Sequence, residues 1–248
     1  MNASQPKPNL FIVGAMKAGT TSLHEYLGEH PEIYMSPTKE PSHFSQKNSY
    51  AKGNKHYLDL FREAEGYQVI GESSTQYAKA PSIQGVPERI YAFNPEAKII
   101  YIMRDPIERA ISHYWFNWEN HGEKRSLSIA IKEDKSYTDI SNYAMQLSLY
   151  AKAFGWSNIK ALTTEELNAN PVATMQELYR WLGVNNEFVP SSPNQKYNVT
   201  PQKMFRPNRR VPLRGKILRS NFYHNRRRYV PDNFRMLGRA LIEERIDR

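Results

Sequence analysis

Cysteine is absent from this 248-residue chain. Its absence excludes a disulfide framework and any metal site built from thiolates. The chain also has no apolar run near the roughly 18 residues that a membrane-spanning helix needs. Residues 1–9 lack the apolar core of a secretory signal. We therefore expect a cytoplasmic protein that does not span a membrane.

Acidic residues are missing from one late segment of the chain. Residues 188–231 contain no Asp or Glu but eleven Lys and Arg, and this segment accounts for the whole net charge of +9. Such a block indicates an anionic partner, for example the phosphates of a nucleotide or an anionic substrate, or else a solvated basic surface. Its prolines and its lack of periodicity predict a long loop or flap.

Short apolar runs alternate with helical patterns along the chain. This alternation is typical of an α/β fold in which helices cover both faces of a parallel sheet. We expect residues 1–248 to form a single domain, with residues 1–8 flexible. The predicted strands are 10–13, 67–70, 98–103 and 158–162, and the predicted helices are 22–29, 82–93, 106–120, 141–154, 172–182 and 232–246.

The most informative segment covers residues 10–22. A buried strand, a loop with two glycines and a helical pattern follow one another there. The free N–H groups and the dipole of such a helix start bind anions, so we expect a phosphorylated ligand at residues 14–22; the alternative is a tight turn without a ligand. Gly14 and Gly19 have the spacing of the nucleotide triphosphatase loop, but Lys17 precedes the second glycine instead of following it.

A second motif, residues 104–114, follows another predicted strand. Asp105 and Pro106 are typical of a helix start, and Ser112 lies about two turns further along the same helix. An arginine at a strand end and a serine on the next helix can converge on one phosphate, which the arginine binds bidentately. The alternative is that Arg104 pairs with a nearby acid.

Together the two motifs resemble those of the sulfotransferases that use 3′-phosphoadenosine 5′-phosphosulfate (PAPS). The resemblance covers residues 9–185 and is nearer to the heparan sulfate and bacterial carbohydrate sulfotransferases than to the steroid and phenol branch. It implies a three-layer, P-loop-like α/β fold with a central parallel sheet flanked by helices. It also implies transfer of a sulfuryl group from PAPS to a hydroxyl of a carbohydrate or small natural product, with no metal ion required.

The resemblance assigns roles to individual residues in both motifs. It implies that Lys17 stabilises the charge on the leaving phosphate and that the 3′-phosphate is bound by Arg104 and Ser112. Lys196 and Arg206, from the late basic segment, are further candidates for the same end of the cofactor. The residues implied to bind the 5′-phosphosulfate are Lys17, Ala18, Gly19, Thr20, Thr21 and Ser22.

The resemblance also implies a general base. The candidate is Glu40 in the sequence Lys39-Glu40-Pro41, and the alternative for this residue is an ion pair with Lys39. His43 is a second candidate, although relatives often carry a histidine one position earlier, where this chain has Ser42. Many heparan sulfate relatives also have Lys or Arg in place of Ser73, and this departure disfavours a heparan-type acceptor.

Two other functions account for parts of the sequence. A Mg²⁺-dependent kinase or nucleotide triphosphatase would use the loop, but the position of Lys17 disfavours it, and Asp105 is the only evident acid at a strand end. A nucleic-acid-binding module would use the basic segment and show salt-dependent affinity, but it leaves both motifs unexplained. We expect a hydroxyl-bearing acceptor and no nucleic-acid partner; the sequence indicates no oligomeric state.

Overall fold

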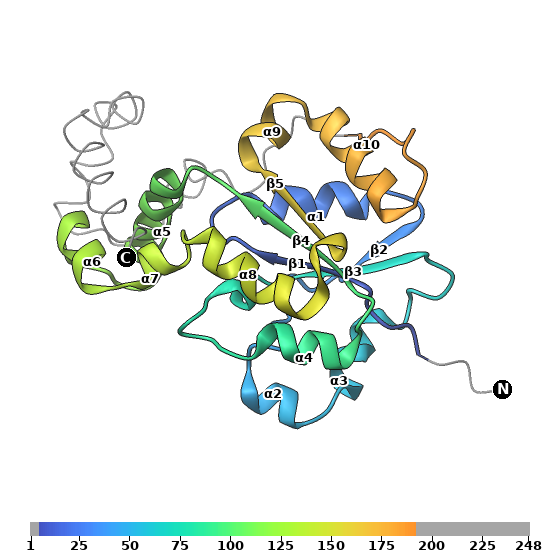
Figure 1. Ribbon diagram of the computed structural model, residues 1–248, viewed down its shortest axis with the longest axis horizontal. Coiled ribbons are helices and arrows are strands. Elements are labelled where there is room, and N and C mark those ends of the chain that lie inside the picture. The colour runs from blue at the N-terminus through green and yellow to red at the C-terminus, as the bar shows by residue number, and fades with distance from the viewer. Residues whose placement is uncertain (1–4, 192–248) are drawn as a thin grey trace, which may run out of the picture.

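A five-stranded parallel sheet forms the centre of the computed structural model, which describes residues 5–191 (Figure 1). The strand order is β2-β3-β1-β4-β5, and every neighbouring pair is parallel. The predicted α/β fold is therefore confirmed. The predicted helix 232–246 lies outside the described residues. The strands are β1 (Leu10–Gly14), β2 (Ile33–Met35), β3 (Val69–Ser73), β4 (Lys98–Met103) and β5 (Ile159–Thr163).

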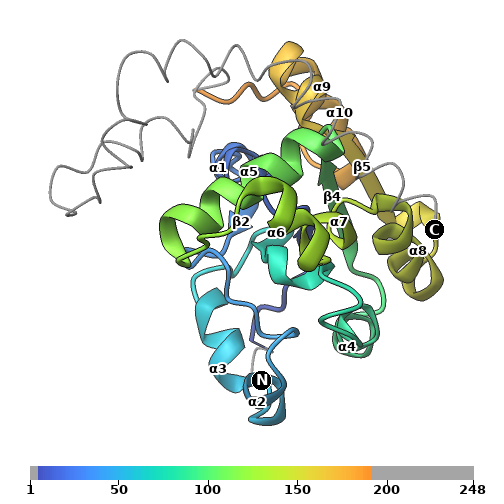
Figure 2. The same ribbon diagram turned by 90° about the vertical axis from the view of Figure 1, so that its left-hand side faces the viewer.

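Helices form a layer on each face of the sheet and a third group beside the strand ends (Figures 1 and 2). One layer contains α1 (Thr20–Gly28), α9 (Thr164–Ala169) and α10 (Pro171–Leu182). The opposite layer contains α2 (Lys47–Ala51), α3 (Lys55–Leu58), α4 (Val86–Phe93) and α8 (Tyr143–Phe154). The third group is α5 (Pro106–Asn120), α6 (Leu127–Glu133) and α7 (Ser136–Asp139). Three short 3-10 helices, η1 (Asp59–Phe61), η2 (Thr75–Ala78) and η3 (Trp156–Asn158), complete the described chain.

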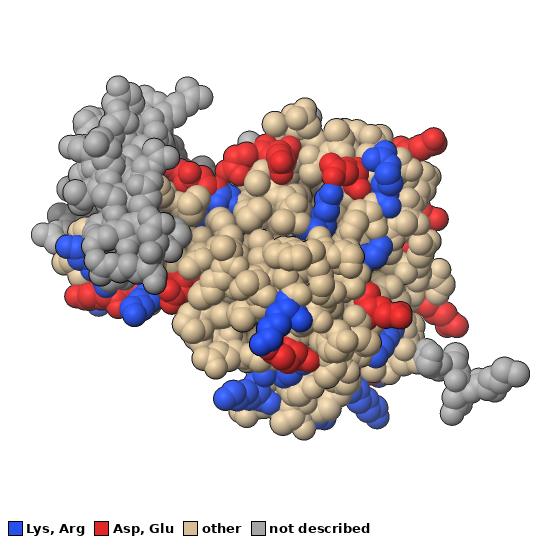
Figure 3. Space-filling view, in the orientation of Figure 1, with Lys and Arg blue, Asp and Glu red and all other residues tan. Residues whose placement is uncertain are grey.

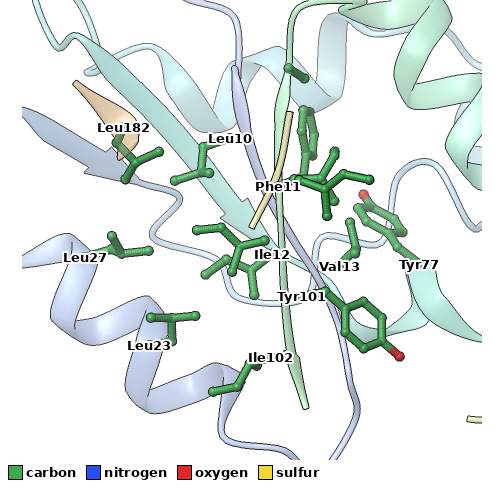
Figure 4. Packing of buried hydrophobic residues seen from close by; sticks show 14 of the residues in the cluster. Leu10, Phe11, Ile12, Val13, Leu23, Leu27, Tyr77, Tyr101, Ile102 and Leu182 are labelled. Atoms are coloured by element: carbon green, nitrogen blue, oxygen red, sulfur yellow. The ribbon is translucent and has the colours of Figure 1, made fainter. Parts of the chain in front are cut away.

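Strand β1 is buried on both faces because its side chains alternate in direction. Leu10 and Ile12 point toward Leu23 of α1, whereas Phe11 and Val13 point toward the opposite helical layer (Figure 4). All residues of β1 are buried. Full burial of each such side chain contributes about 1.5–3 kcal/mol, so this strand anchors the core and fixes the start of the loop that follows it.

Strand β3 differs from its prediction in a way that matters for the site. It begins at Val69 and continues through Ser73, so Gly71 and Glu72 lie within the strand and not after it. The predicted boundary at residue 70 was wrong because Gly71, which was interpreted as the end of the strand, lies within it. Here hydroxyl groups hydrogen-bond to the Glu72 carboxyl, which allows it to be buried.

Helix α1 begins at Thr20, two residues before its predicted start. Gly19 is its N-cap and has a φ of 95°, a left-handed conformation that glycine adopts without strain. The prediction for β4 and that for α5 match the structure at both ends. Strand β2 and the helices α2, α3, α6, α7 and α9 were not predicted because segments of three to seven residues show too little periodicity.

The described surface carries basic and acidic side chains intermixed, as the face in Figure 3 shows. Residues 5–191 contain 19 Lys and Arg against 21 Asp and Glu. The positive charge of the chain therefore comes from residues outside this range. Within residues 5–191, no helix has the length and apolar character needed to cross a membrane.

Asp105 caps α5, and its removal should destabilise the fold. Its Oδ1 accepts hydrogen bonds from the amides of Ile107 (3.0 Å) and Glu108 (2.9 Å). We predict that Asp105→Ala lowers the free energy of unfolding by about 1 kcal/mol, because both amides lose this acceptor. Asp105→Asn keeps an oxygen at this position and should lower the free energy of unfolding by less. Urea denaturation measures both, and an equal loss in the two variants would contradict the capping role.

Candidate active site

All five strands point their carboxyl ends to the same edge of the sheet, where ligand sites form in folds of this kind. The predicted motifs meet at this edge, beside α5, α6 and α7 (Figure 2). The amide of Glu40 donates to the carbonyl of Ser73 at 2.9 Å, and the amide of Ser74 donates to the carbonyl of Ile12 at 3.0 Å. These bonds join the segments that follow β1, β2 and β3 into one platform.

The loop from Gly14 to Gly19 presents an anion-binding helix start. No side chain caps the N-terminus of α1, and a helix start of this kind binds anions through its first-turn amides. Thr20 and Thr21 lie in that turn, as Ser22 does. Lys17 has a φ of 70°, and its Nζ lies 4.8 Å from the centre of the Phe116 ring on α5. The loop therefore directs its lysine toward α5.

Neighbouring elements hold this loop in place. The amide of Ala15 donates to the carbonyl of Ile102 at 2.7 Å, and the guanidinium of Arg109 donates to the carbonyl of Met16 at 3.4 Å. The hydroxyl of Thr164 hydrogen-bonds to the carbonyl of the predicted binding residue Ala18. The loop is thus fixed from β4, α5 and α9, and its shape is set before any ligand binds.

Arg109 is an internal anchor and not a ligand-binding cation. It is fully buried, and it donates to Ser141 Oγ and to the carbonyl of Tyr137, both at 2.6 Å. Burial lowers the pKa of Arg109 to about 10. From the sequence, no role was assigned to this residue. Its contacts instead hold α5 and α7 against the loop that contains Met16.

Glu40 lies at this edge of the sheet, and Thr75 holds its carboxylate by hydrogen bonds. Its Oε2 accepts from the amide of Thr75 at 2.8 Å, and the Thr75 hydroxyl lies 3.2 Å from both oxygens. Lys39 Nζ lies 3.1 Å from Oε1, so the ion pair that the sequence left open is present. The side chain of Glu40 stays 36% exposed. A substrate can therefore reach a carboxylate whose direction Thr75 fixes.

His43, the other candidate base, is buried among aromatic rings. Its Nδ1 lies 3.3 Å from Ser49 Oγ and its Nε2 lies 3.1 Å from Asn54 Oδ1. Its ring stacks on Tyr57 at 4.6 Å, and burial lowers the pKa of His43. Its catalytic role stays a prediction. Because both of its nitrogens contact the protein, the geometry favours Glu40.

Arg104 and Ser112 lie where the second motif predicts them, at the end of β4 and two turns into α5. Arg104 Nη2 is 3.5 Å from Glu108 Oε2, which is the acid pairing that the sequence left open. This pair is partly exposed, and surface pairs of this kind contribute only about 0–1 kcal/mol, so a phosphate can compete with the carboxylate. Ser112 is buried on α5, the helix that also carries Glu108. Lys196 and Arg206 lie outside the described residues.

Two basic side chains that sequence reasoning missed border the same space. Burial lowers the pKa of Lys79, the charge of Glu40 raises it, and Arg109 lowers it further. Burial, together with the charges of Arg109, Lys79 and Lys17, lowers the pKa of His113 to about 3. His113 is therefore neutral, and its buried Nδ1 has no partner within residues 5–191. Lys79 thus interacts with Glu40, and His113 interacts with both Lys79 and Lys17.

Lys79 is also relevant to position 73, where this chain has Ser73 and the resemblance indicates Lys or Arg in many heparan sulfate relatives. Ser73 Oγ lies 2.8 Å from His24 Nδ1, so the position where heparan sulfate relatives carry a cation is filled here by a buried polar pair. Lys79 supplies a cation near Glu40 from the other end of η2. This arrangement could not be predicted from local sequence patterns because η2 has no periodic pattern.

A second carboxyl group, that of Glu72, lies buried behind Glu40. Its Oε1 accepts from the hydroxyls of Tyr57 (2.8 Å) and Tyr77 (2.6 Å), and its Oε2 accepts from Ser74 Oγ (2.7 Å). Burial raises the pKa of Glu72 to about 7, although these hydroxyls oppose the shift. From the sequence, Glu72 was noted only as part of the polar segment 71–77, which follows the strand predicted at residues 67–70.

The raised pKa of Glu72 predicts a pH-dependent stability. The folded value is about 7 and the ordinary value is 4.5, so the folded protein binds a proton that the unfolded chain releases between them. This contribution is present below pH about 4.5 and is lost as the pH rises through about 7. Relative to Glu72→Gln, the wild type should lose on the order of 3 kcal/mol of unfolding free energy across this window.

Urea denaturation of the wild type and of Glu72→Gln at about pH 5 and about pH 8 measures this change. The comparison cancels the contributions of the buried histidines, which both proteins share. A difference between the two proteins that does not depend on pH would contradict the shift.

The chain belongs to the sulfotransferase family, whose model matches residues 8–187. A solved sulfotransferase from Alicyclobacillus acidocaldarius is 28% identical, with a TM-score of 0.69 over 98% of this chain and 97% of that one. A mouse sulfotransferase complexed with PAP, 14% identical with a TM-score of 0.53 over 98% of this chain and 90% of that one, shares the fold. The resemblance that the two motifs indicate is thus confirmed.

Curated relatives include the heparan sulfate glucosamine 3-O-sulfotransferase 3B1 of Mus musculus, 29% identical over 190 residues, or 73% of this chain and 47% of that protein. The membrane-associated sulfotransferase kil1 of Dictyostelium discoideum is 35% identical over 113 residues, or 44% of this chain and 23% of that protein. The chain therefore spans less than half the length of both relatives.

Proposed function

We propose that this chain transfers the sulfuryl group of PAPS to a hydroxyl group of a carbohydrate acceptor. One observation carries the proposal: the Lys17 loop and Glu40 lie at the same carboxyl edge of the sheet, where Lys79 interacts electrostatically with Glu40, and His113 interacts with both Lys79 and Lys17. Family membership supports the reaction class. The name of the mouse 3-O-sulfotransferase supports the acceptor class.

The described residues fit a nucleotide with phosphates at both ends. The uncapped start of α1 supplies amides, and Lys17 supplies a positive charge, for the 5′-phosphosulfate. Arg104 and Ser112 supply a guanidinium and a hydroxyl for the 3′-phosphate. The buried Nδ1 of His113 has no hydrogen-bond partner within residues 5–191, and His113 interacts electrostatically with Lys17. Lys196 and Arg206 are proposed to contact the 3′-phosphate end as well.

Each proposed catalytic group has one task. Glu40 accepts the proton of the acceptor hydroxyl as the bond from the acceptor oxygen to sulfur forms. Lys17 stabilises the negative charge that the 5′-phosphate acquires as its oxygen–sulfur bond breaks. Thr75 fixes the direction of the Glu40 carboxylate through its amide and hydroxyl. When bound, PAPS supplies the activated sulfuryl group, and the proposed reaction uses no metal ion.

Aromatic side chains of α5 suit a carbohydrate acceptor. Phe116 lies against Lys17 Nζ, and Trp118 is 39% exposed further along the helix. Flat aromatic rings pack well against the apolar faces of sugar rings. Tyr114, in contrast, is buried and packs in a small core with Tyr137. Of the aromatic side chains of α5 named here, Tyr114 is therefore not available to a substrate.

The Mg²⁺-dependent kinase or triphosphatase is not favoured. The carboxylate of Asp105, the acid at a strand end that would suit Mg²⁺, caps α5 instead. The family match also points to sulfuryl transfer. A nucleic-acid-binding role has no support within residues 5–191, which carry slightly more acidic than basic side chains.

A transfer assay tests the proposal. Radiolabelled PAPS is incubated with heparosan oligosaccharides, maltose oligosaccharides and p-nitrophenol, and the labelled product is measured. We predict transfer to an oligosaccharide, and a fall in kcat of ~10²–10⁴-fold in Glu40→Gln, because the general base is lost. Affinity for the desulfated product, adenosine 3′,5′-bisphosphate, should not change.

Glu65→Gln makes the same chemical change at an exposed position and serves as the control. Full kcat in Glu40→Gln would refute the role of Glu40. Transfer to p-nitrophenol alone would refute the carbohydrate acceptor.

A further inference from the structure

We propose that Glu72 is a positioning residue for Glu40: through the hydroxyls of Ser74 and Tyr77, it holds the backbone segment that carries the base. The inference rests on the proposed role of Glu40. Glu72 has no exposed surface and cannot reach a substrate. Its effect on the reaction must therefore pass through the groups that it contacts.

The segment that carries Glu40 has an unusual backbone. Glu40 has a φ of 61° and Ser42 a φ of 55°, with Pro41 between them. Residues other than glycine rarely adopt this left-handed conformation, and it persists only where the surroundings impose it. Contacts outside residues 40–42 must therefore hold the segment.

Two hydroxyl groups supply such contacts. The amide of Ser42 donates to Ser74 Oγ at 2.9 Å, and the amide of Phe44 donates to the hydroxyl of Tyr77 at 3.4 Å. The same two hydroxyls donate to Glu72, Ser74 Oγ at 2.7 Å and Tyr77 at 2.6 Å. Each hydroxyl thus links the buried carboxyl to one amide of the segment.

Glu72 determines the direction in which these hydroxyls donate. A hydroxyl has one proton and two lone pairs, whereas the Glu72 carboxylate, which is ionised above its pKa of about 7, only accepts. Because Glu72 takes the protons of Ser74 and Tyr77, their lone pairs face the two amides. A third hydroxyl, that of Tyr57, also donates to Glu72, and its ring stacks on His43 of the same segment. Glu72 therefore orders three contacts with one short stretch of chain.

The next residues of the chain hold the base itself. Ser73 accepts the amide of Glu40 through its carbonyl at 2.9 Å, and Thr75 binds the Glu40 carboxylate. Residues 72–75 thus set both the backbone and the carboxylate of Glu40. A misplacement of a catalytic group by about 1 Å can slow a reaction by roughly 100-fold, so loosening residues 42–44 should reduce kcat.

Ser74→Ala and Tyr77→Phe each remove one linking hydroxyl and leave Glu72 in place. We expect kcat to fall by about 10- to 100-fold in each, with the KM for PAPS and the affinity for adenosine 3′,5′-bisphosphate unchanged. The assay uses radiolabelled PAPS and the acceptor from the panel above that gives the highest rate. Tyr179→Phe is the matched control: it removes a buried hydroxyl that donates to the Tyr26 carbonyl at 3.1 Å.

The decisive test repeats Ser74→Ala in the Glu40→Gln background. If Ser74 acts through Glu40, its removal causes no further loss of kcat there; if it only stabilises the fold, the same fold-loss appears in both backgrounds. An additive loss, or full kcat in both Ser74→Ala and Tyr77→Phe, overturns the inference and leaves the proposed function intact. Full kcat in Glu40→Gln overturns the proposed function and this inference with it.

Discussion

The buried central strand β1 is the constraint on which the rest of the site depends. Its side chains pack against both helical layers, so its carboxyl end is fixed between β3 and β4. Backbone bonds from Ser74 to Ile12 and from Ala15 to Ile102 then attach the neighbouring segments to this end. The Lys17 loop, Glu40 and the second motif are therefore all attached to the core of the fold, and Arg109 of α5 also joins the second motif to the loop.

The two carboxyl groups of the site differ because their surroundings differ. Glu40 is partly exposed and contacts Lys39 and Thr75, whereas Glu72 is fully buried and contacts only hydroxyls. Burial raises the pKa of Glu72 to about 7. Such a division lets one carboxyl act on a substrate while the other holds the structure around it. Lys79 adds a positive charge that interacts with Glu40.

Local patterns were sufficient to predict the α/β fold and the positions of the glycine loop and of α5, whereas the binding roles of their residues stay predictions. Helix α5 matches its prediction at both ends because Asp105 and Pro106 mark its start, and Gly19 lies at the end of the predicted loop. The sequence did not reveal Glu72 or Lys79, since their roles depend on partners 15 and 39 positions away that no motif connects to them. The single-domain organisation, the cytoplasmic location and the roles of Lys196 and Arg206 stay predictions.

Under the proposed function, this edge of the sheet binds a nucleotide phosphorylated at both ends. Calorimetric titration with adenosine 3′,5′-bisphosphate, AMP and Mg²⁺-ATP measures it most directly. A charge-assisted contact from Arg104 to the 3′-phosphate should make the bisphosphate bind roughly 10- to 100-fold more tightly than AMP. Arg104→Ala should remove that advantage. Tighter binding of Mg²⁺-ATP than of the bisphosphate would contradict the account.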